Sequence, residues 1–425
     1  MTITQLLKRQ LSTGKIKPLQ GIRVLEMGQL IAGPFTGTIL GYYGAEVIKV
    51  EPIRGGDPIR IWRDLDKDGV SPWFRSLGRN KKSCTIDLKT SQGQELVKQL
   101  AQKSDVLIEN FRPNTMEKWG LGPDEIYKLN PDLVYTRVSG YGQTGPYSSR
   151  PGFASVCEGM GGFRYVNGFP GEAPVRPNMS LGDSLAGLHA ALGVLLGLIA
   201  RDKLKKEQFL NPSSGTSKTG QVVDVAIYES VFNMMESIVP DYDRFGKVRE
   251  ASGTTLTGIV PTNVYQCKDE KFVIIGGNGD SIYKRLMTTA GRPDLTTKDY
   301  ENNADRVKHQ SVIDGAISDW TRSLTSSQVL EHLDIANVPA GRIYNAEDIV
   351  TDEQYKSRNM IETVDVNGSP LKIPAITPKL SETPGSTEWA GPDLGQHNRE
   401  VFLELLGIPE EKVNQLVKEN VIGKL

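Results

Sequence analysis

The residue with the clearest chemical potential is Asp183, which follows Gly182 at the start of a predicted apolar helix, 183–200. A carboxylate at a helix N-terminus is held anionic by the partial positive charge there. An anionic carboxylate can act as a nucleophile toward activated acyl carbon. The same position also favours Asp simply as an N-cap. The local sequence leaves both interpretations open.

A glycine-rich segment, Gly276-Gly277-Asn278-Gly279-Asp280, lies between a predicted strand at 272–275 and a predicted helix at 282–290. Such a loop exposes backbone N–H groups that suit a phosphate or an oxyanion. It matches neither a Walker loop nor the full dinucleotide-binding fingerprint. The alternative is a plain sharp turn.

Other kinds of chemistry have less support. The four histidines, at 189, 309, 332 and 397, lack metal-ligand spacing, so we expect no metal site. The Gly-x-Ser-x-Gly signature of a serine hydrolase is absent from the sequence. Most basic residues near predicted strand ends would be solvated, and a few could pair with a phosphate; they are Lys81, Lys82, Lys89, Arg112 and Lys118.

The elements that must position these residues alternate between strand and helix. Strands are predicted at 22–26, 45–50, 105–109, 133–138 and 221–226, with helices at 36–43 and 92–102 between them. This alternation predicts an α/β fold with a mostly parallel sheet of doubly wound type. The polar stretch 203–220 is predicted to be a surface loop and 240–258 a linker. Beyond them we expect helices near 312–320 and 329–336, an extended tail at 371–392, and helices at 399–406 and 410–420.

Composition narrows the class of protein. The chain has 425 residues and a net charge of −1, with 38% hydrophobic and 24% charged residues, which is typical of a soluble globular protein. The balanced charge argues against nucleic acid or an anionic membrane as a partner. Three distant cysteines cannot form a disulfide framework, which fits a reduced intracellular compartment. The apolar run 185–200 is shorter than a bilayer span and is predicted to be a buried core helix.

The termini carry weak targeting signals. The first 25 residues contain five basic residues and no acid, as in a mitochondrial presequence or a basic tail. The C-terminal Gly-Lys-Leu differs by one residue from a peroxisomal signal. We therefore expect the mitochondrial matrix, with cytoplasm and peroxisome as alternatives.

Nine short stretches, in order along nearly the whole chain, resemble the class III CoA-transferases of CaiB/BaiF type, the family of formyl-CoA transferase and carnitine CoA-transferase. The matching segments are 32–34 with 41–51 (GYYGAEVIKVE), 80–83, 87–89, 105–111 (DVLIENF), 140–146 (GYGQTGP), 182–183, 219–224, the 276 loop, and 394–397 (LGQH).

The resemblance implies an interlocked homodimer, with a large Rossmann-like domain built from both ends of the chain and a small middle domain. We expect residues 1–20 as a tail or targeting segment, 21–238 and 342–425 in the large domain, 239–258 as a linker and 259–341 as the small domain. The family's nucleophile aligns with Asp183, which would carry CoA as an aspartyl thioester, and its active-site lid with Gly276, Gly277 and Gly279. Its CoA contacts align with Ile31, Ala32, Ile86, Lys89, Asn110, Phe111, Arg112 and Lys118. CoA thioesters would be substrates, and no permanent cofactor is implied.

Two departures from the family pattern bear on specificity. Pro52 replaces a basic CoA-contacting residue of formyl-CoA transferase, a role that Arg54 could take over. Ala154 replaces an acidic active-site residue, which leaves room and removes a negative charge near the acceptor. We therefore expect an acceptor that is larger and more negative than formate. The chain also resembles the enzymes that move CoA between succinate and longer or branched dicarboxylates such as glutarate, hydroxymethylglutarate or itaconate, which implies succinyl-CoA as donor and a dicarboxylate as acceptor.

Two rival functions remain. The α-methylacyl-CoA racemase branch of the superfamily needs two acid–base groups, and its His-Asp pair aligns here with Phe153 and Ala154. The other rival is a non-catalytic acyl-CoA-binding protein. Retention of Asp183 and the glycine loop argues against it.

Overall fold

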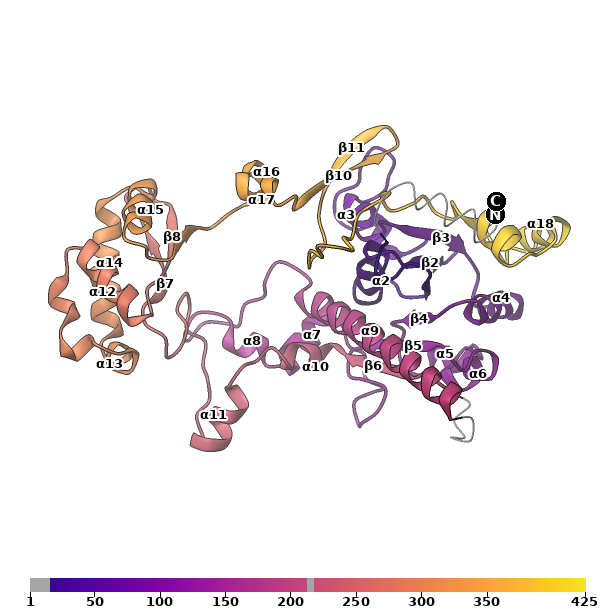
Figure 1. Cartoon of the computed structure of the whole chain (residues 1–425), viewed down its shortest axis with the longest axis horizontal. Helices are drawn as coiled ribbons and strands as arrows, with labels where there is room; N and C mark the ends of the chain where they lie inside the picture. Colours follow the sequence, from indigo (N-terminus) through magenta and orange to yellow (C-terminus); the bar gives the residue numbers. More distant parts are fainter. Residues whose placement is uncertain (1–15, 212–217) are drawn as a thin grey trace. The chain divides into compact units, whose positions relative to one another are not determined.

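A computed structural model describes residues 16–211 and 218–425. It divides into two compact units, shown with the whole chain in Figure 1. Among the described residues, the first unit comprises those within 1–162, 177–235 and 356–425, and the second those within 163–176 and 236–355. Both ends of the chain thus contribute to the first unit. The second unit also takes in the short segment 163–176, which the expected domain boundaries place in the large domain.

The first unit is built on a sheet in which neighbouring strands run parallel in the order β3-β2-β1-β4-β5-β6. The strands are β1 (Arg23–Glu26), β2 (Glu46–Glu51), β3 (Lys81–Thr85), β4 (Val106–Glu109), β5 (Val134–Ser139) and β6 (Val222–Ala226). The strand order reverses between β1 and β4. In such sheets this switch point opens a crevice at the carboxyl ends of the strands. The predicted α/β fold with a parallel sheet is confirmed.

The sheet is covered on both faces, which explains why its strands read as unbroken apolar runs. On β1, Leu25 belongs to the core cluster shared with Leu96 of α4 (Ser91–Gln102), while Val24 faces the cluster shared with Val194 of α9 (Leu181–Leu210). The first face also carries α6 (Pro123–Leu129), the π-helical segment η5 (Glu400–Leu405) and α18 (Glu410–Lys418). The second face carries α2 (Ala32–Tyr42) beside α9. Short elements complete the unit: η1 (Pro58–Ile61), α3 (Pro72–Leu77), α5 (Thr115–Lys118), α7 (Ala154–Met160), α10 (Ile227–Phe232) and the antiparallel hairpin β10 (Ile361–Val366) and β11 (Ser369–Pro374).

The long helix α9 corrects two expectations, the surface loop predicted at 203–220 and the buried core helix predicted at 185–200. It continues to Leu210, so residues 203–210 are helical rather than loop, because Lys, Glu and Gln are good helix formers on an exposed surface. The rest of the predicted loop, 212–217, lies outside the described residues. By length and composition α9 could cross a membrane, but a core helix of a soluble protein passes the same test. It packs on α2, β5 and β6 with one face only, and its other face is exposed.

The second unit contains a small antiparallel sheet, β7 (Thr262–Gln266), β8 (Phe272–Gly276) and β9 (Ala340–Arg342). Its core is formed with α12 (Asp280–Thr289), α14 (Gln310–Ser323) and α15 (Ser326–Ile335). The remaining helices are α8 (Phe163–Val166), α11 (Ile238–Phe245), η3 (Pro293–Thr296), η4 (Lys298–Tyr300), α13 (Asn303–Lys308) and α16 (Ala346–Thr351), and α17 (Glu353–Ser357) spans the boundary of the unit.

Two further predictions need correction. The predicted linker contains α11, since Pro240 falls in the first turn of that helix, where proline is tolerated. The predicted tail segment 1–20 lies mostly outside the described residues, so its targeting role stays a prediction. Its last residues are folded onto the first unit, because Lys17 pairs with Glu388 at 2.6 Å and Leu19 is buried.

Candidate active site

The positions predicted to contact CoA gather at the carboxyl edge of the parallel sheet. Ile31 and Ala32 follow β1 and begin α2, Ile86 and Lys89 follow β3, and Asn110 follows β4 directly. Phe111, Arg112 and Lys118 continue from Asn110. The loops after β1 and β4 flank the switch point, where open α/β sheets bind their ligands. The structure therefore brings these residues to one edge of the first unit.

Asp183 lies at the same edge. The helix α9 crosses back before the parallel strand β6, so its N-terminus lies at the carboxyl ends of the strands. Asp183 is the third residue of the helix and is half-buried. The N-cap position belongs to Ser180, so the interpretation of Asp183 as an N-cap is wrong. Its place in the first turn still gives its carboxylate the stabilisation of the helix dipole.

The turn that carries Asp183 is packed tightly by neighbouring elements. Gly182 donates its backbone N–H to the buried Glu158 of α7 at 3.2 Å. A Cβ at Gly182 would lie 3.4 Å from Cβ of Ala154, so the position that lacks the family's acidic residue adjoins the Asp183 turn. One turn later, a Cβ at Gly187 would lie 2.8 Å from the carbonyl oxygen of Ala32. The Asp183 face of α9 therefore meets the first residue of α2, where the loop after β1 ends.

The pKa of the Cys157 thiol reflects both burial and the carboxylates in this region. Burial raises its pKa to about 11, with further contributions from the carboxylates of Asp183 and Glu158. At neutral pH the thiol is therefore protonated. The three cysteines, Cys84, Cys157 and Cys267, are buried and free, as expected of a chain without a disulfide framework.

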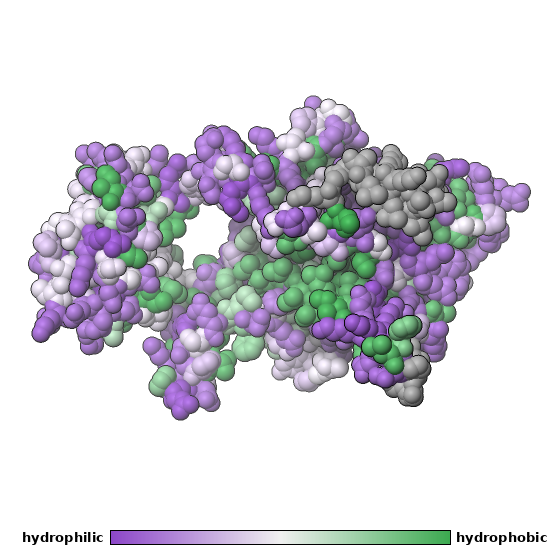
Figure 2. Space-filling view, in the orientation of Figure 1, coloured by the Kyte–Doolittle hydropathy of each residue, from purple (hydrophilic) through white to green (hydrophobic). Residues whose placement is uncertain are grey.

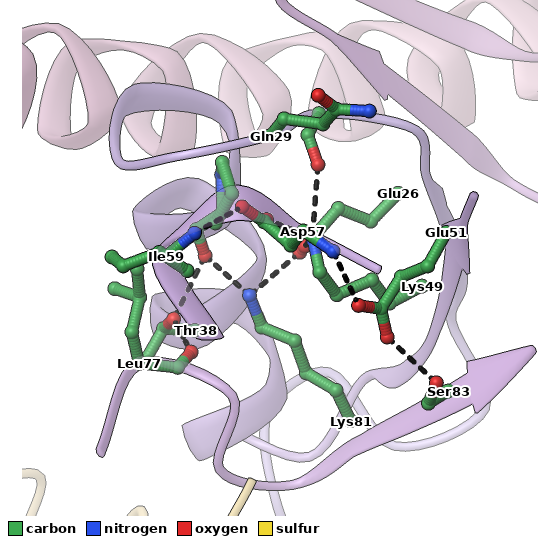
Figure 3. A network of polar contacts seen from close by, with 12 residues as sticks. Glu26, Gln29, Thr38, Lys49, Glu51, Asp57, Ile59, Leu77, Lys81 and Ser83 are labelled. Atoms are coloured by element: carbon green, nitrogen blue, oxygen red, sulfur yellow. Dashed lines mark hydrogen bonds and ion pairs between the residues drawn. The ribbon is translucent and has the colours of Figure 1, made fainter. Parts of the chain in front are cut away.

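A buried network of charges supports the loop after β1 (Figure 3). Lys49 pairs with Glu26 at 3.1 Å and with Asp57 at 2.8 Å, and Lys81 pairs with Glu26 at 2.8 Å. Burial opposes the charge on both lysines. The carboxylates of Asp57 and Glu26 nevertheless raise the pKa of Lys49. Lys81 has one carboxylate partner and a like charge in Lys49, and its pKa falls to about 8.

The three basic residues among the predicted CoA contacts are exposed, whereas Ile31, Ala32 and Ile86 are buried. Lys89, Arg112 and Lys118 lie on the surface near the carboxyl ends of β3 and β4. Exposed basic side chains at this edge are free to reach a charged phosphate group. Pro52 and Arg54 are also exposed, in the loop that follows β2. Arg54 is thus accessible enough to supply the positive charge toward CoA that Pro52 cannot.

The glycine loop lies in the second unit, between β8 and α12. Gly276, Gly277 and Gly279 have φ angles outside the left-handed region, so the conformation of a sharp turn is not what requires glycine here. Packing also leaves little room at Gly277, because a Cβ there would lie 2.5 Å from Cδ2 of Leu286 and would displace the end of that side chain. The buried Arg306 donates to the carbonyl oxygen of Asn278 at 2.8 Å and anchors the loop.

Comparison with known proteins identifies the family. A model of CoA-transferase family III matches residues 19–398. The chain belongs to this family.

The relatives of this family III CoA-transferase span nearly its whole length. Succinyl-CoA–D-citramalate CoA-transferase from Chloroflexus aurantiacus is 45% identical over 96% of this chain and 98% of its own. The beta subunit of succinyl-CoA–L-malate CoA-transferase from the same organism is 40% identical over 95% of this chain and 98% of its own. A crystal structure of a CaiB/BaiF family protein from Brucella suis matches with a TM-score of 0.79 and 28% identity, covering 92% of this chain and 100% of that one. The resemblance drawn from motifs is confirmed, and the enzyme uses CoA thioesters as substrates.

Four residues that support the predicted site positions cannot be picked out from the sequence: Lys49, Asp57 and Glu158 in the first unit, and Arg306 beside the glycine loop of the second unit. Two of them carry a local signal. Asp57 precedes Pro58 at the start of η1, a typical N-cap pattern, and Lys49 interrupts an apolar strand. Glu158 and Arg306 have no comparable signal, because their partners lie elsewhere in the chain.

Proposed function

We propose that this enzyme transfers CoA from succinyl-CoA to a dicarboxylic acid, with Asp183 as the nucleophile that carries CoA between them. The observation that carries the proposal is the packing of the Asp183 face of α9 against Ala32, one of the predicted CoA contacts, at the carboxyl edge of the sheet. In this proposal the half-buried carboxylate of Asp183, on the same face of the helix, meets an acyl group bound by the loop after β1.

The proposed reaction consists of acyl transfers in which one bond to acyl carbon forms as another breaks. A carboxylate oxygen of Asp183 attacks the carbonyl carbon of succinyl-CoA, which gives a mixed anhydride and expels CoA thiolate. The thiolate attacks the Asp183 carbonyl, releases succinate and leaves an aspartyl-CoA thioester. The acceptor carboxylate then forms a second anhydride and expels the thiolate. Attack of the thiolate on the acceptor carbonyl gives the new acyl-CoA and restores Asp183.

The local electrostatics support a carboxylate nucleophile. Asp183 lies in the first turn of a 30-residue helix, where the dipole stabilises the resting anion. The cycle needs no net proton transfer, which is consistent with a site in which the neighbouring thiol of Cys157 stays protonated. We propose further that Gly276, Gly277 and Gly279 form the lid that keeps water from the anhydrides, because hydrolysis would waste the thioester.

The acceptor we propose is a four- or five-carbon dicarboxylate, including hydroxylated ones. The relatives named for D-citramalate and L-malate support this class. Ala154 supports it as well, because a small uncharged side chain beside the Asp183 turn does not repel a second carboxylate.

We also propose that the enzyme is a homodimer. Four apolar residues on the outer face of α9, which we call the α9 face, are more than half exposed: Leu188 (53%), Leu192 (53%), Leu196 (58%) and Ile199 (53%). Figure 2 shows a hydrophobic area over this helix. A continuous apolar stripe of this kind is typical of an interface. A second copy of the chain is the occupant that the resemblance implies.

The test is a matrix of acyl-CoA donors against carboxylic acids, read by mass spectrometry of the CoA products. We expect succinyl-CoA with malate, citramalate or itaconate to give the highest turnover and formate to give little. Exchange of the donor's α-proton with solvent in the absence of an acceptor acid would indicate a racemase instead. Binding of CoA without turnover for every pair would indicate a binding protein.

A further inference from the structure

Side chains, rather than backbone, hold the turn that precedes the predicted CoA contacts Ile31 and Ala32. In three consecutive residues, Gly28, Gln29 and Leu30, the backbone hydrogen bonds run to three side chains from other parts of the first unit. Loops usually satisfy their backbone with water or with their own turn bonds. A turn held from outside at each residue has little freedom to change its conformation.

Lys49 and Asp57 hold the two ends of this turn (Figure 3). Lys49 donates to the carbonyl oxygen of Gly28 at 2.9 Å, and Leu30 donates its backbone N–H to Oδ1 of Asp57 at 2.9 Å. The two side chains form an ion pair with each other at 2.8 Å. Asp57 is completely buried and Lys49 is 2% exposed, so the pair is shielded from solvent. Hydrogen bonds to buried charged groups are the strong ones.

Asn110, at the end of β4, holds the middle of the turn. Its Oδ1 accepts from the backbone N–H of Gln29 at 2.8 Å, and its Nδ2 donates to the carbonyl oxygen of Gln29 at 2.8 Å. The amide is enclosed by glycines on both sides, because a Cβ at Gly28 would lie 3.1 Å from Oδ1 and one at Gly33 would lie 3.3 Å from Cγ. The amide of Asn110 is thus engaged at both ends by Gln29.

The turn needs this support because Leu30 has a φ of 65°. A leucine in the left-handed region is strained by its own Cβ, and such strain persists only where surrounding contacts over-determine it. The rest of the network extends the support into α2, since Lys81 donates to the carbonyl oxygen of Pro34 at 2.6 Å. The two lysines also balance the charges of Glu26 and Asp57.

We infer that Lys49, Asp57 and Asn110 form a clamp that fixes the Gly28–Leu30 turn in the conformation that presents Ile31 and Ala32 to CoA. Asn110 then acts as a positioning residue, and its side-chain amide is not a ligand of CoA. The inference rests on the proposed function for the identity of the ligand. The clamp itself is a property of the free protein and can be tested without any substrate.

The experiment measures amide hydrogen exchange in the free enzyme and binding of CoA by calorimetry. The variants are Asp57→Asn, which keeps the size but loses the charge that pairs with Lys49, and Asn110→Leu, which cannot bond Gln29. We expect exchange at Gln29 and Leu30 to become about tenfold faster or more, and CoA to bind about tenfold more weakly, as for lost charge-assisted or buried hydrogen bonds. With saturating acyl-CoA, kcat should change much less than KM.

The matched control is Asp105→Asn. Asp105 accepts a backbone N–H from Arg23 at 2.9 Å and pairs with Arg201 at 2.8 Å, at the opposite edge of the sheet. The Asp105→Asn variant should leave both amide exchange at the Gly28–Leu30 turn and CoA affinity unchanged. Unaltered exchange at Gln29 and Leu30 in folded Asp57→Asn or Asn110→Leu would overturn the clamp. Failure of the unsubstituted enzyme to bind CoA would overturn the proposed function. The amide exchange rates would still test the clamp in that case. If Asp57→Asn does not fold, Asn110→Leu decides alone.

Discussion

At the scale of single residues, a substitution of Asp183 distinguishes a structural role of this residue from a chemical one. Ser180 occupies the N-cap of α9, so replacing Asp183 leaves the cap in place, and the first-turn charge that is lost is worth about 0.3–1 kcal/mol. We predict that Asp183→Asn abolishes turnover while the protein stays folded. The measurements are kcat and urea unfolding. Hydroxylamine added with succinyl-CoA should trap a hydroxamate on the peptide that contains Asp183.

The control for this prediction is the Asp183→Asn protein itself, in which hydroxylamine should trap nothing. Substantial turnover of this variant, with mass spectrometry excluding deamidation back to Asp, would contradict covalent catalysis.

Ala154 tests the origin of acceptor specificity. Because it adjoins Gly182, a longer acidic side chain there would place a negative charge beside the Asp183 turn. We predict that Ala154→Glu lowers kcat/KM for dicarboxylates by about tenfold more than for monocarboxylates, a loss of about 1.4 kcal/mol of selective transition-state stabilisation. Ala154→Gln is the matched control, since it adds nearly the same volume without the charge. If the Glu and Gln variants discriminated equally between dicarboxylates and monocarboxylates, the effect would be steric and the electrostatic explanation would be wrong.

At the scale of elements, the end of β2 makes part of the stability of the first unit dependent on pH. Burial alone would raise the pKa of Glu51, but hydrogen bonds from Arg60 and Ser83 and the charge of Lys49 lower it to about 2. Because the pKa of Glu51 is lower in the folded state, its carboxylate stabilises the fold when the pH is above about 4.5, the pKa in the unfolded state. This contribution is lost as the pH falls toward 2, the pKa in the folded state. We predict a loss of about 3 kcal/mol over that interval.

The measurement is the free energy of urea unfolding between pH 6 and the lowest pH at which the protein is still folded. Glu51→Gln should be less stable at pH 6 and should show a flatter acid limb. Parallel acid limbs for the two proteins would contradict the assignment to Glu51.

The sequence predicts well those strands whose apolar pattern does not depend on one particular partner residue. β1, β2, β4 and β5 have apolar residues on both faces, and any strand covered on both sides needs them. β3 begins with two lysines and was missed, because the burial of Lys81 depends on Glu26 in another strand. The extension of α9 to Leu210 was missed because helix formers that lie in solvent resemble a polar loop in composition.

At the scale of the whole molecule, the sequence predicts which positions matter better than it predicts how they are held. Asp183 and the predicted CoA contacts of the loops after β1 and β4 reach one edge of the sheet because parallel βαβ connections bring strand ends and helix starts together. The clamp around Gly28–Leu30 joins β2, η1 and β4, and no spacing along the chain encodes such long-range pairs. The motifs thus predict the ligand contacts, while the side chains that support them appear only in three dimensions.

The proposed assembly gives the last prediction, because four exposed apolar residues on the α9 face need a partner. Gel filtration with light scattering should give a mass near twice 46.7 kDa. The dimer should persist at nanomolar concentration, since interlocked chains must unfold to separate.

A Leu192→Asp, Leu196→Asp double variant buries two charges in that interface and should yield monomer or unfolded chain. Ile335→Asp is the control, because Ile335 is 78% exposed at the end of α15 and lies outside this face. A monomer in dilute solution of the unsubstituted protein would refute the interlocked dimer, and an intact dimer of the double variant would place the interface elsewhere.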